Sequence, residues 1–229
     1  MVDHEVIISH EGKDLVFMPQ IELLGTYIGV EEQIKEQRLI APTFAETISL
    51  IYFAFENQHE EWANQILEPF RKKWFWAYTG TLFVPYKGVY VQDNPQIING
   101  KVIMNKSELV KKLKSEKSKT IEGVIFSKDG SVRFVPIGYK IGKHTADDLA
   151  RNTLLLGLAG EKGRERAVKI AQYFDSKPPQ IYSFKDVDEE KTRVCAIGAG
   201  CSGGLDIGAN DEYDKGEAFA FGYKLKEAA

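Results

Sequence analysis

Cysteine is scarce in this sequence, and long apolar segments are missing from it. Only two cysteines, Cys195 and Cys201, occur among 229 residues, a usage typical of proteins from a reducing compartment. The longest apolar runs, Leu50–Phe55 and Leu154–Gly160, fall far short of the ~18 residues that a membrane span requires. The start of the chain has early acidic residues and no apolar stretch of signal-peptide length. We therefore expect a soluble cytoplasmic protein that has no membrane partner.

A strong excess of one charge is missing as well. The chain has 30 lysines and arginines against 33 aspartates and glutamates, which gives a formal net charge of −3. Proteins that bind nucleic acid over their whole surface are usually strongly basic, so this class is disfavoured, while a local basic patch stays open. The hydrophobic content of 43% is that of an ordinary globular protein. The length predicts a single domain over residues 1–229, with a turn at residues 93–95 as the alternative domain boundary.

Helix signals recur along the chain. Thr43 and Glu46 match a capping box, and the apolar residues that follow recur at helical spacing. They predict a buried helix over about Phe44–Glu56. For Glu31–Arg38, a polar helix and a solvated loop both stay open. Further helices are predicted from a cap at Asn57–Glu60 to a stop at Pro69, from Ser107 past Leu113, from Thr145 to about Ala159 with Gly160 as its stop, and from Arg164 to Phe174.

Strand signals alternate with these helices. Asn99-Gly100 between apolar residues is a strong hairpin signal, and the aromatic-rich stretch Trp74–Val91 is typical of strands with turns at Gly80 and Gly88. Further strands are predicted over residues 5–9, 13–18, 123–126, 131–135, 191–197 and 218–225, with a loop over residues 198–216. Hairpins mixed with about five helices predict an α+β fold with antiparallel strands, rather than a doubly wound Rossmann sheet.

One stretch of the sequence has the pattern of a nucleotide-binding turn. In Arg193–Gly204, RVCAIGAGCSGG, a short apolar run leads into Gly198, Gly200 and Gly203, which satisfy G-x-G-x-x-G. Taken alone, this stretch is similar to the phosphate-binding turn of flavin and nicotinamide enzymes. The resemblance implies an enzyme that would bind a nucleotide or a flavin on Gly198–Gly204.

The residues after the glycines argue against that function. A phosphate-binding turn needs a helix that begins at the third glycine, so that its N–H groups face the pyrophosphate. The continuation has glycines at positions 204, 208 and 216 and no helical period, and each interior glycine costs a helix about 1 kcal/mol. We therefore predict that no helix forms there and that the glycines serve positive φ or close backbone approach. We also expect no bound cofactor.

Cys201 and His144 are the candidates for catalysis. Cys201, on a glycine loop, would act as a nucleophile if a histidine lowered its pKa. His144, with Asp147 or Asp148, would supply a base and its orienting group. The alternative is that His144 only precedes a helix cap. Cys195, in a predicted strand, is expected to be a small buried hydrophobe.

No metal site is predicted. The cysteines and the four scattered histidines lack the spacing of a zinc site. The acidic loop with Asp206, Asp211, Glu212 and Asp214 does not follow the pattern of an EF-hand, so we expect a solvated loop there.

Aromatic residues gather next to a basic triplet. Between Trp62 and Tyr90 there are nine of the 26 aromatic residues of the chain. Basic residues beside aromatic ones suit a stacking groove for single-stranded nucleic acid or a platform for a sugar. The alternative is that the tryptophans, which alternate along one strand face, belong to the core. The candidates for a nucleic-acid site are Arg71, Lys72, Lys73, Trp74 and Trp76.

No catalytic site is evident in the sequence as a whole. We expect a soluble intracellular binding or interaction protein, with a protein or a small ligand as its partner. Two alternatives stay open: a nucleotide- or flavin-binding enzyme on Gly198–Gly204, and a nucleic-acid binder on residues 71–78. A second basic run, Lys111–Lys119, is either a phosphate-binding surface or a solvated helix end.

Overall fold

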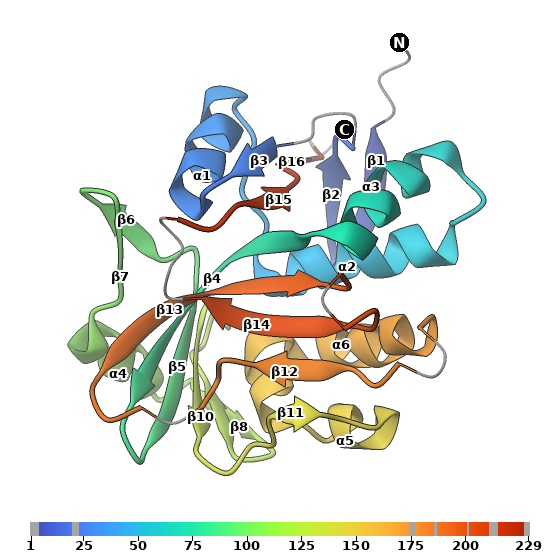
Figure 1. The fold of residues 1–229 in the computed structure, drawn as a ribbon. Helices are drawn as coiled ribbons and strands as arrows, with labels where there is room; N and C mark the ends of the chain where they lie inside the picture. Colours follow the sequence, from blue (N-terminus) through green and yellow to red (C-terminus); the bar gives the residue numbers. More distant parts are fainter. Residues whose placement is uncertain are drawn as a thin grey trace.

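A large, mostly antiparallel sheet organises the molecule (Figure 1). The computed structural model describes residues 5–19, 23–174, 177–185, 187–200, 202–210 and 215–226. Eleven strands of this described part belong to the sheet. Nine of them follow the order β11 (Gly142–Lys143), β12 (Gln180–Tyr182), β14 (Asp206–Asn210), β13 (Lys191–Gly198), β4 (Trp74–Val84), β5 (Gly88–Asp93), β10 (Val132–Pro136), β9 (Val124–Phe126) and β8 (Lys119–Ile121). The other two are β15 (Ala218–Ala220), which pairs with β4, and β3 (Leu23–Gly25), which pairs with β15.

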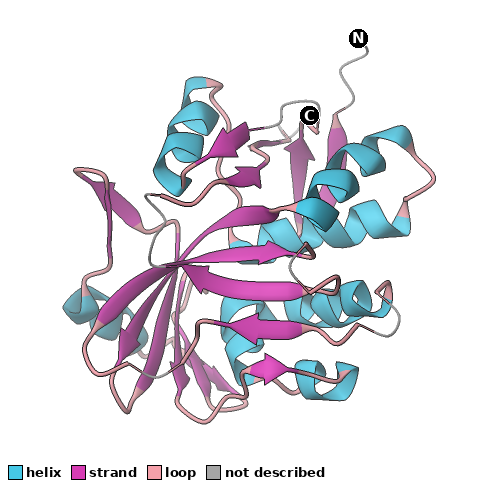
Figure 2. Cartoon of the chain, viewed as in Figure 1, coloured by secondary structure: helices cyan, strands magenta, loops and turns pink. Residues whose placement is uncertain are grey.

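Three of the helices cover one face of this sheet (Figure 2). α2 (Phe44–Glu56), α3 (Glu61–Lys72) and α6 (Thr153–Gln172) form the main core with inward residues of the central strands. α4 (Lys106–Leu113) lies beside β5 and β10, and α5 (Ala146–Ala150) directly precedes α6.

The predicted capping box defines the start of α2. The backbone N–H of Thr43 donates to Glu46 Oε2 at 2.7 Å, and the N–H of Glu46 donates to Thr43 Oγ1 at 3.3 Å. The apolar stripe that follows buries Ile48, Ile51 and Phe55. The helix spans Phe44–Glu56, as predicted.

The next helix continues past the proline that was expected to stop it. α3 runs over Glu61–Lys72 and contains Pro69. Phe70 is fully buried and packs edge-on against Phe55 and Phe75. Core packing therefore holds the last turn in place despite the N–H that proline lacks.

A kink divides α6 into two halves, where the sequence predicts two helices. Gly160 has φ 70° and ψ 179° between the helical halves. The kink leaves carbonyl groups at the end of the first half without helical partners. Arg133 takes the place of the missing partners: its Nε donates to Gly157 O at 2.8 Å, and its Nη2 donates to Leu158 O at 3.0 Å. The cap predicted at Thr145 begins only the short helix α5.

A smaller core lies on the opposite face of the sheet. α1 (Tyr27–Glu36), β3 and β15 cover β4 there. The ring of Tyr27 lies 5.7 Å from that of Trp76 and 4.6 Å from that of Tyr78, measured between ring centroids. Of the two alternatives for residues 31–38, the helix is the one that forms, and it begins earlier than predicted.

Two small sheets complete the described part of the fold. One consists of β1 (Val6–His10), β2 (Lys13–Phe17) and β16 (Tyr223–Leu225), and the other of β6 (Gln96–Ile98) and β7 (Lys101–Ile103). The turn predicted at Asn99-Gly100 joins a hairpin, and so does the turn at residues 11–12 between the first two predicted strands.

Three further predicted boundaries are wrong. Gly80 lies inside β4 rather than at a turn. The predicted loop over residues 198–216 contains β14, which pairs with β13 and with β12. Residues 218–225 form two strands, because β15 joins the large sheet while β16 joins a small one.

The architecture is α+β with mostly antiparallel strands, as predicted, and is not a doubly wound Rossmann sheet. Within the residues that the structure describes, no helix has both the length and the apolar character needed to cross a membrane.

Candidate functional site

The glycine stretch forms the end of β13 and leads into β14. Gly198 pairs with Trp74 on one side and with Asp206 on the other. β14 begins at Asp206, in the segment where a nucleotide-binding turn requires a helix. Over residues 202–210 the predicted absence of a helix is confirmed.

The packing of the backbone explains these glycines. A Cβ atom on Gly198 would lie 2.8 Å from Lys73 O, and one on Gly200 would lie 2.8 Å from Lys72 O. Gly203 has φ 72°, a conformation that favours glycine. Close backbone approach at Gly198 and Gly200 and positive φ at Gly203 agree with the roles predicted for these glycines.

His144 is buried and held by backbone and amide groups. Its Nδ1 lies 2.8 Å from Gly142 O, and its Nε2 lies 3.0 Å from Asn152 Nδ2. Asp148, which the sequence offered as an orienting group for His144, instead pairs with Lys140 at 2.6 Å. These contacts agree with the alternative in which His144 only precedes a helix cap.

Of the two cysteines, Cys195 is described by the structure, and Cys201, the candidate nucleophile, lies outside the described residues. Cys195 is fully buried in β13, and burial raises the pKa of its thiol well above the ordinary range. It behaves as the small hydrophobe that the sequence predicts.

The acidic loop is only partly described. Asp206 is buried and accepts hydrogen bonds from the backbone N–H and the hydroxyl of Ser202, at 3.0 and 2.6 Å. Asp211, Glu212 and Asp214 lie outside the described residues. Within those residues, no group of three histidine, cysteine or acidic side chains is placed to hold a metal ion.

The basic triplet belongs to the helix layer. Arg71 lies over the ring of Phe55, 5.6 Å from its centroid, and Lys72 pairs with Glu68 at 2.5 Å. Lys73 is exposed at the C-cap of α3. Two of the three cations therefore already have partners in the helix layer, Arg71 on α2 and Lys72 on α3.

The two tryptophans project from the opposite face of the sheet. Trp76 is 2% exposed, and its Nε1 donates to Gly25 O at 3.0 Å, so it belongs to the smaller core. Trp74 is half-buried at the edge of that core. Trp74 and the basic triplet thus do not form one continuous stacking surface.

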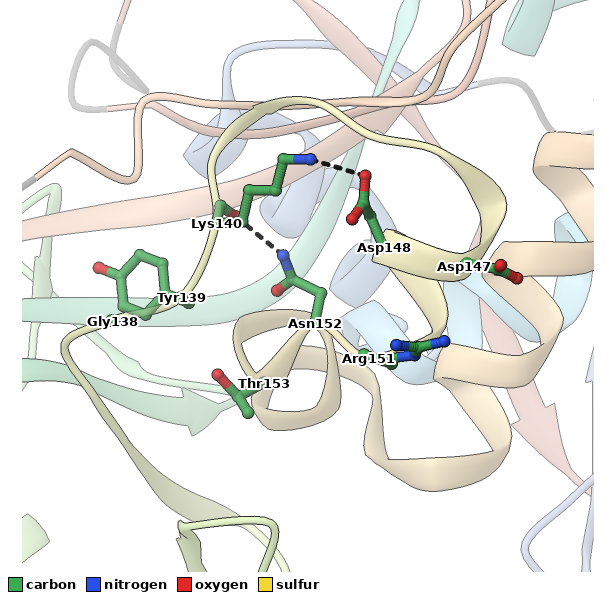
Figure 3. Close-up of a pocket in the computed structure, with 8 residues that line it drawn as sticks. All are labelled: Gly138, Tyr139, Lys140, Asp147, Asp148, Arg151, Asn152 and Thr153. Atoms are coloured by element: carbon green, nitrogen blue, oxygen red, sulfur yellow. Dashed lines mark hydrogen bonds and ion pairs between the residues drawn. The ribbon is translucent and has the colours of Figure 1, made fainter.

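A polar pocket of about 280 Å³ lies at the corner between α5 and α6 (Figure 3). Lys140 and Asp148 face each other across it, and Asn152 Nδ2 donates to Lys140 O at 2.8 Å. The bonds from Lys140 and from Thr145 lower the pKa of the Asp148 carboxyl. These polar groups satisfy one another and close the corner, so they leave little for a ligand. The lining residues are Gly138, Tyr139, Lys140, Asp147, Asp148, Arg151, Asn152 and Thr153.

A groove with aromatic ends crosses four neighbouring strands. The register places Tyr182 of β12 beside Gly208 of β14, Gly208 beside Ala196 of β13, and Ala196 beside Trp76 of β4. Residues paired in this way present their side chains on the same face. This row therefore has an aromatic residue at each end and the two smallest residue types between them.

Trp74 shapes the floor of this groove. Its indole reaches over β14, where a Cβ atom on Gly208 would lie 3.4 Å from Cη2 and Cζ3 of the ring. Glu217, just before β15, is exposed at the rim. The groove has a volume of about 370 Å³ and is lined by Trp74, Trp76, Tyr182, Ser183, Ala196, Gly208, Ala209, Gly216, Glu217 and Ala218.

Sequence analysis singled out the aromatic residues at one end of this groove and missed the one at the other end. Trp74 and Trp76 are among the predicted candidates, whereas Tyr182 and Glu217 are not. The available signal was Gly208, because an isolated glycine within a strand often marks the close approach of another group.

Comparison with known proteins identifies the class of fold. No family model matches the chain, and no curated protein matches it. The fold is of the C-type lectin kind, as a likeness to a solved structure shows. That structure is described as "Accommodation of massive sequence variation in Nanoarchaeota by the C-type lectin fold". The TM-score is 0.56 at 15% sequence identity, and the match covers 95% of this chain and 100% of the other.

Proposed function

We propose that this protein is a soluble intracellular binding protein that holds a sugar ring in the aromatic groove. The observation that carries the proposal is the placement of two half-buried aromatic side chains, Trp74 and Tyr182, around a floor of Gly208 and Ala196. A flat ligand fits such a floor because neither floor residue has a side chain larger than a methyl group.

A sugar suits this arrangement chemically. One face of a pyranose carries C–H groups, which are attracted to the negative face of an aromatic ring. Its hydroxyl groups need polar partners at the edge, where Glu217 supplies a carboxylate and Ser183 a hydroxyl.

The lining favours binding over catalysis. Among the described residues of the groove, Glu217 and Tyr182 are the titratable side chains, whereas hydrolysis of a glycosidic bond normally uses a pair of carboxylates. The structure with the similar fold is described as accommodating massive sequence variation. A scaffold with that property keeps its core while a surface site changes, which supports a binding role in general terms.

Calorimetric titration with a panel of mono- and oligosaccharides tests the proposal. We expect saturable binding of at least one sugar, and Trp74→Ala and Tyr182→Ala should each weaken it on the order of tenfold. Trp62→Phe is the control. Trp62 stacks on Phe53 in the helix layer, away from the groove, so this variant should bind the sugar as the wild type does. The proposal would be overturned if no sugar of the panel binds, or if Trp74→Ala binds the sugar as tightly as the wild type does.

A single-stranded oligonucleotide is the informative rival ligand in the same titration, because bases also stack on aromatic side chains. Its binding would fall steeply with salt concentration, whereas binding of a neutral sugar should not change. A salt-sensitive oligonucleotide complex that needs Lys73 would replace the sugar proposal.

A further inference from the structure

A polar cavity of about 690 Å³ lies on the helix-covered side of the sheet, away from the aromatic groove. It is bounded by the turn between β1 and β2, the start of α2, the end of β5, β8, the turn between β9 and β10, and the kink of α6. Its lining includes Arg133, which pairs with Asp93, and His10 from the end of β1. The aromatic groove does not use any of these residues.

His10 is oriented by a hydroxyl group that has no hydrogen left to give. Ser49 Oγ donates to Ala45 O at 2.8 Å, one turn back in α2, and accepts a hydrogen bond from Arg166 Nη1. The Nδ1 atom of His10 lies 2.8 Å from the same oxygen. Because a hydroxyl has one hydrogen, Nδ1 must carry the proton and donate it to Ser49. The lone pair of the imidazole is therefore on Nε2.

This Nε2 atom has no hydrogen-bond partner among the described residues, although the side chain is only 9% exposed. The side chain as a whole is nearly buried, but Nε2 itself is reached through the cavity, so water or a bound ligand can donate a hydrogen bond to it. Its position in the lining of the cavity leaves it available to a bound molecule. The ligand must offer His10 a donor, such as a hydroxyl group.

The neutral form of His10 fits this role. Burial lowers the pKa of His10 and outweighs the opposite effect of the carboxylates of Glu46, Glu11 and Asp93, which come from α2, the β1–β2 turn and β5. Arg166 of α6 lowers the pKa further. Near neutral pH the ring is therefore an acceptor at Nε2 and a donor at Nδ1.

Four lysines line the same cavity, and none forms an ion pair with another residue of the described chain. They are Lys13, Lys119, Lys128 and Lys162. Three of the lining carboxylates are already held: Glu46 by Tyr223 at 2.9 Å, Asp93 by Arg133, and Asp129 by the hydroxyls of Ser127 and Ser131 at 2.6 and 2.8 Å. The other two lining carboxylates, Glu11 and Glu161, form no ion pair with these lysines within the described residues, so the lysines are available to an anionic group.

We infer that this cavity binds a small molecule that carries both a hydroxyl group and an oxyanion, with the hydroxyl donating to His10 Nε2 and the oxyanion accepting from the lysines. A phosphate and a carboxylate share this chemistry. Glycerol 3-phosphate and glycerate are therefore the probes, and glycerol, which lacks the anion, is the comparison.

Histidine side-chain NMR on the full chain tests the inference. The ring nitrogen shifts should first show the proton of His10 on Nδ1. Either anionic probe, at millimolar concentration, should then move the His10 signals saturably, whereas glycerol should move them much less. The His144 signals should stay still, because both of its ring nitrogens face groups of the protein. The inference would be overturned if neither anionic probe moves the His10 signals, or if glycerol moves them as far as the anionic probes do.

Two variants separate the parts of the site. His10→Asn keeps a donor for Ser49 but has no atom in place of Nε2, so affinity for glycerol 3-phosphate, measured by calorimetry, should fall on the order of tenfold. Lys128→Gln should weaken it about two- to fivefold. Lys87→Gln is the matched control, because it removes the same charge from an exposed lysine of the turn between β4 and β5, outside the cavity. Wild-type affinity in His10→Asn would contradict the inference, and so would equal losses in the two lysine variants.

Discussion

The two faces of β4 differ in how they are covered, although neighbouring residues of one strand make both. On one face, Phe75 is 1% exposed and packs against the rings of Phe70 and Phe221 beneath the helix layer. On the other face, Trp74 is half-buried beside the small residues of β13 and β14. The comparison teaches that residue type alone does not decide between core and surface, because the element that covers each face decides it.

Stability and binding of the proposed sugar ligand should therefore separate between the two faces. The helix-covered face contains the buried apolar residues and the Arg133–Asp93 ion pair. The groove face keeps the small residues Ala196 and Gly208, with the Trp74 ring in contact with Gly208. Substitutions on the first face should change the free energy of unfolding, while substitutions in the groove should change ligand binding.

Truncating the two adjacent aromatic residues of β4 tests this separation most strongly. Phe75→Ala should lower the free energy of unfolding by about 3–5 kcal/mol, because it leaves a cavity in the main core. Trp74→Ala should cost less than half as much, because its ring is only partly buried at the edge of the smaller core. Urea denaturation of both variants measures the difference. Equal losses would show that the groove face is as much core as the helix-covered face.

The second largest loss in the free energy of unfolding is expected from removing the buried guanidinium of Arg133. Arg133→Met should cost about 3 kcal/mol, since it leaves the Asp93 carboxylate unpaired and the Gly157 and Leu158 carbonyls without a donor. The double variant with Asp93→Asn should recover part of this loss, because the unpaired charge is then gone. Urea denaturation of the two single variants and the double variant gives the coupling. A loss below about 1 kcal/mol in Arg133→Met would mean that water replaces the guanidinium.

Adding a methyl group at Gly198, the last residue of β13, should lower the free energy of unfolding by a smaller amount. Gly198→Ala should cost about 1–3 kcal/mol, because its Cβ would meet Lys73 O at 2.8 Å and the backbone must shift. Thermal unfolding measures this loss. Gly203→Asn is the control, because asparagine tolerates positive φ and its closest neighbour is the end of the Lys177 side chain. If Gly198→Ala were as stable as the wild type and lost nucleotide binding instead, the phosphate-turn hypothesis would regain support.

The sequence could predict the elements that are set by local contacts. The capping box of α2 needs only Thr43 and Glu46, three residues apart, and the hairpin at Asn99-Gly100 needs only its turn. β14 was missed because Asp206–Asn210 contains a glycine and polar ends, and its strand state depends on pairing with residues 180–182 and 194–198.

The candidate site was harder to predict than the fold for the same reason. The role of Trp76 depends on Gly25 O, which is 51 residues away in the chain. The second wall of the groove, Tyr182, faces the tryptophans only through the strand order β12-β14-β13-β4. The glycine pattern was correctly attributed to close backbone approach, but its partners, Lys72 and Lys73, could not be named from sequence.

The smallest expected effect concerns pH and the polar cavity on the helix-covered side. Hydrogen bonds from Ser127, and then from Ser131, lower the pKa of Asp129 to about 2 from an ordinary 3.8. A lowered folded-state pKa stabilises the fold above the unfolded-state pKa, and this contribution is lost as pH falls from about 4 to about 2. Asp129→Asn should therefore be less stable than the wild type at neutral pH, by under about 1 kcal/mol because the site is exposed. Urea denaturation between pH 7 and about pH 2 should show the gap closing in that acidic window, since the wild-type carboxylate is protonated there. A gap that stays constant down to the lowest pH would mean that the hydroxyls of Ser127 and Ser131 bind the amide as well as they bind the carboxylate.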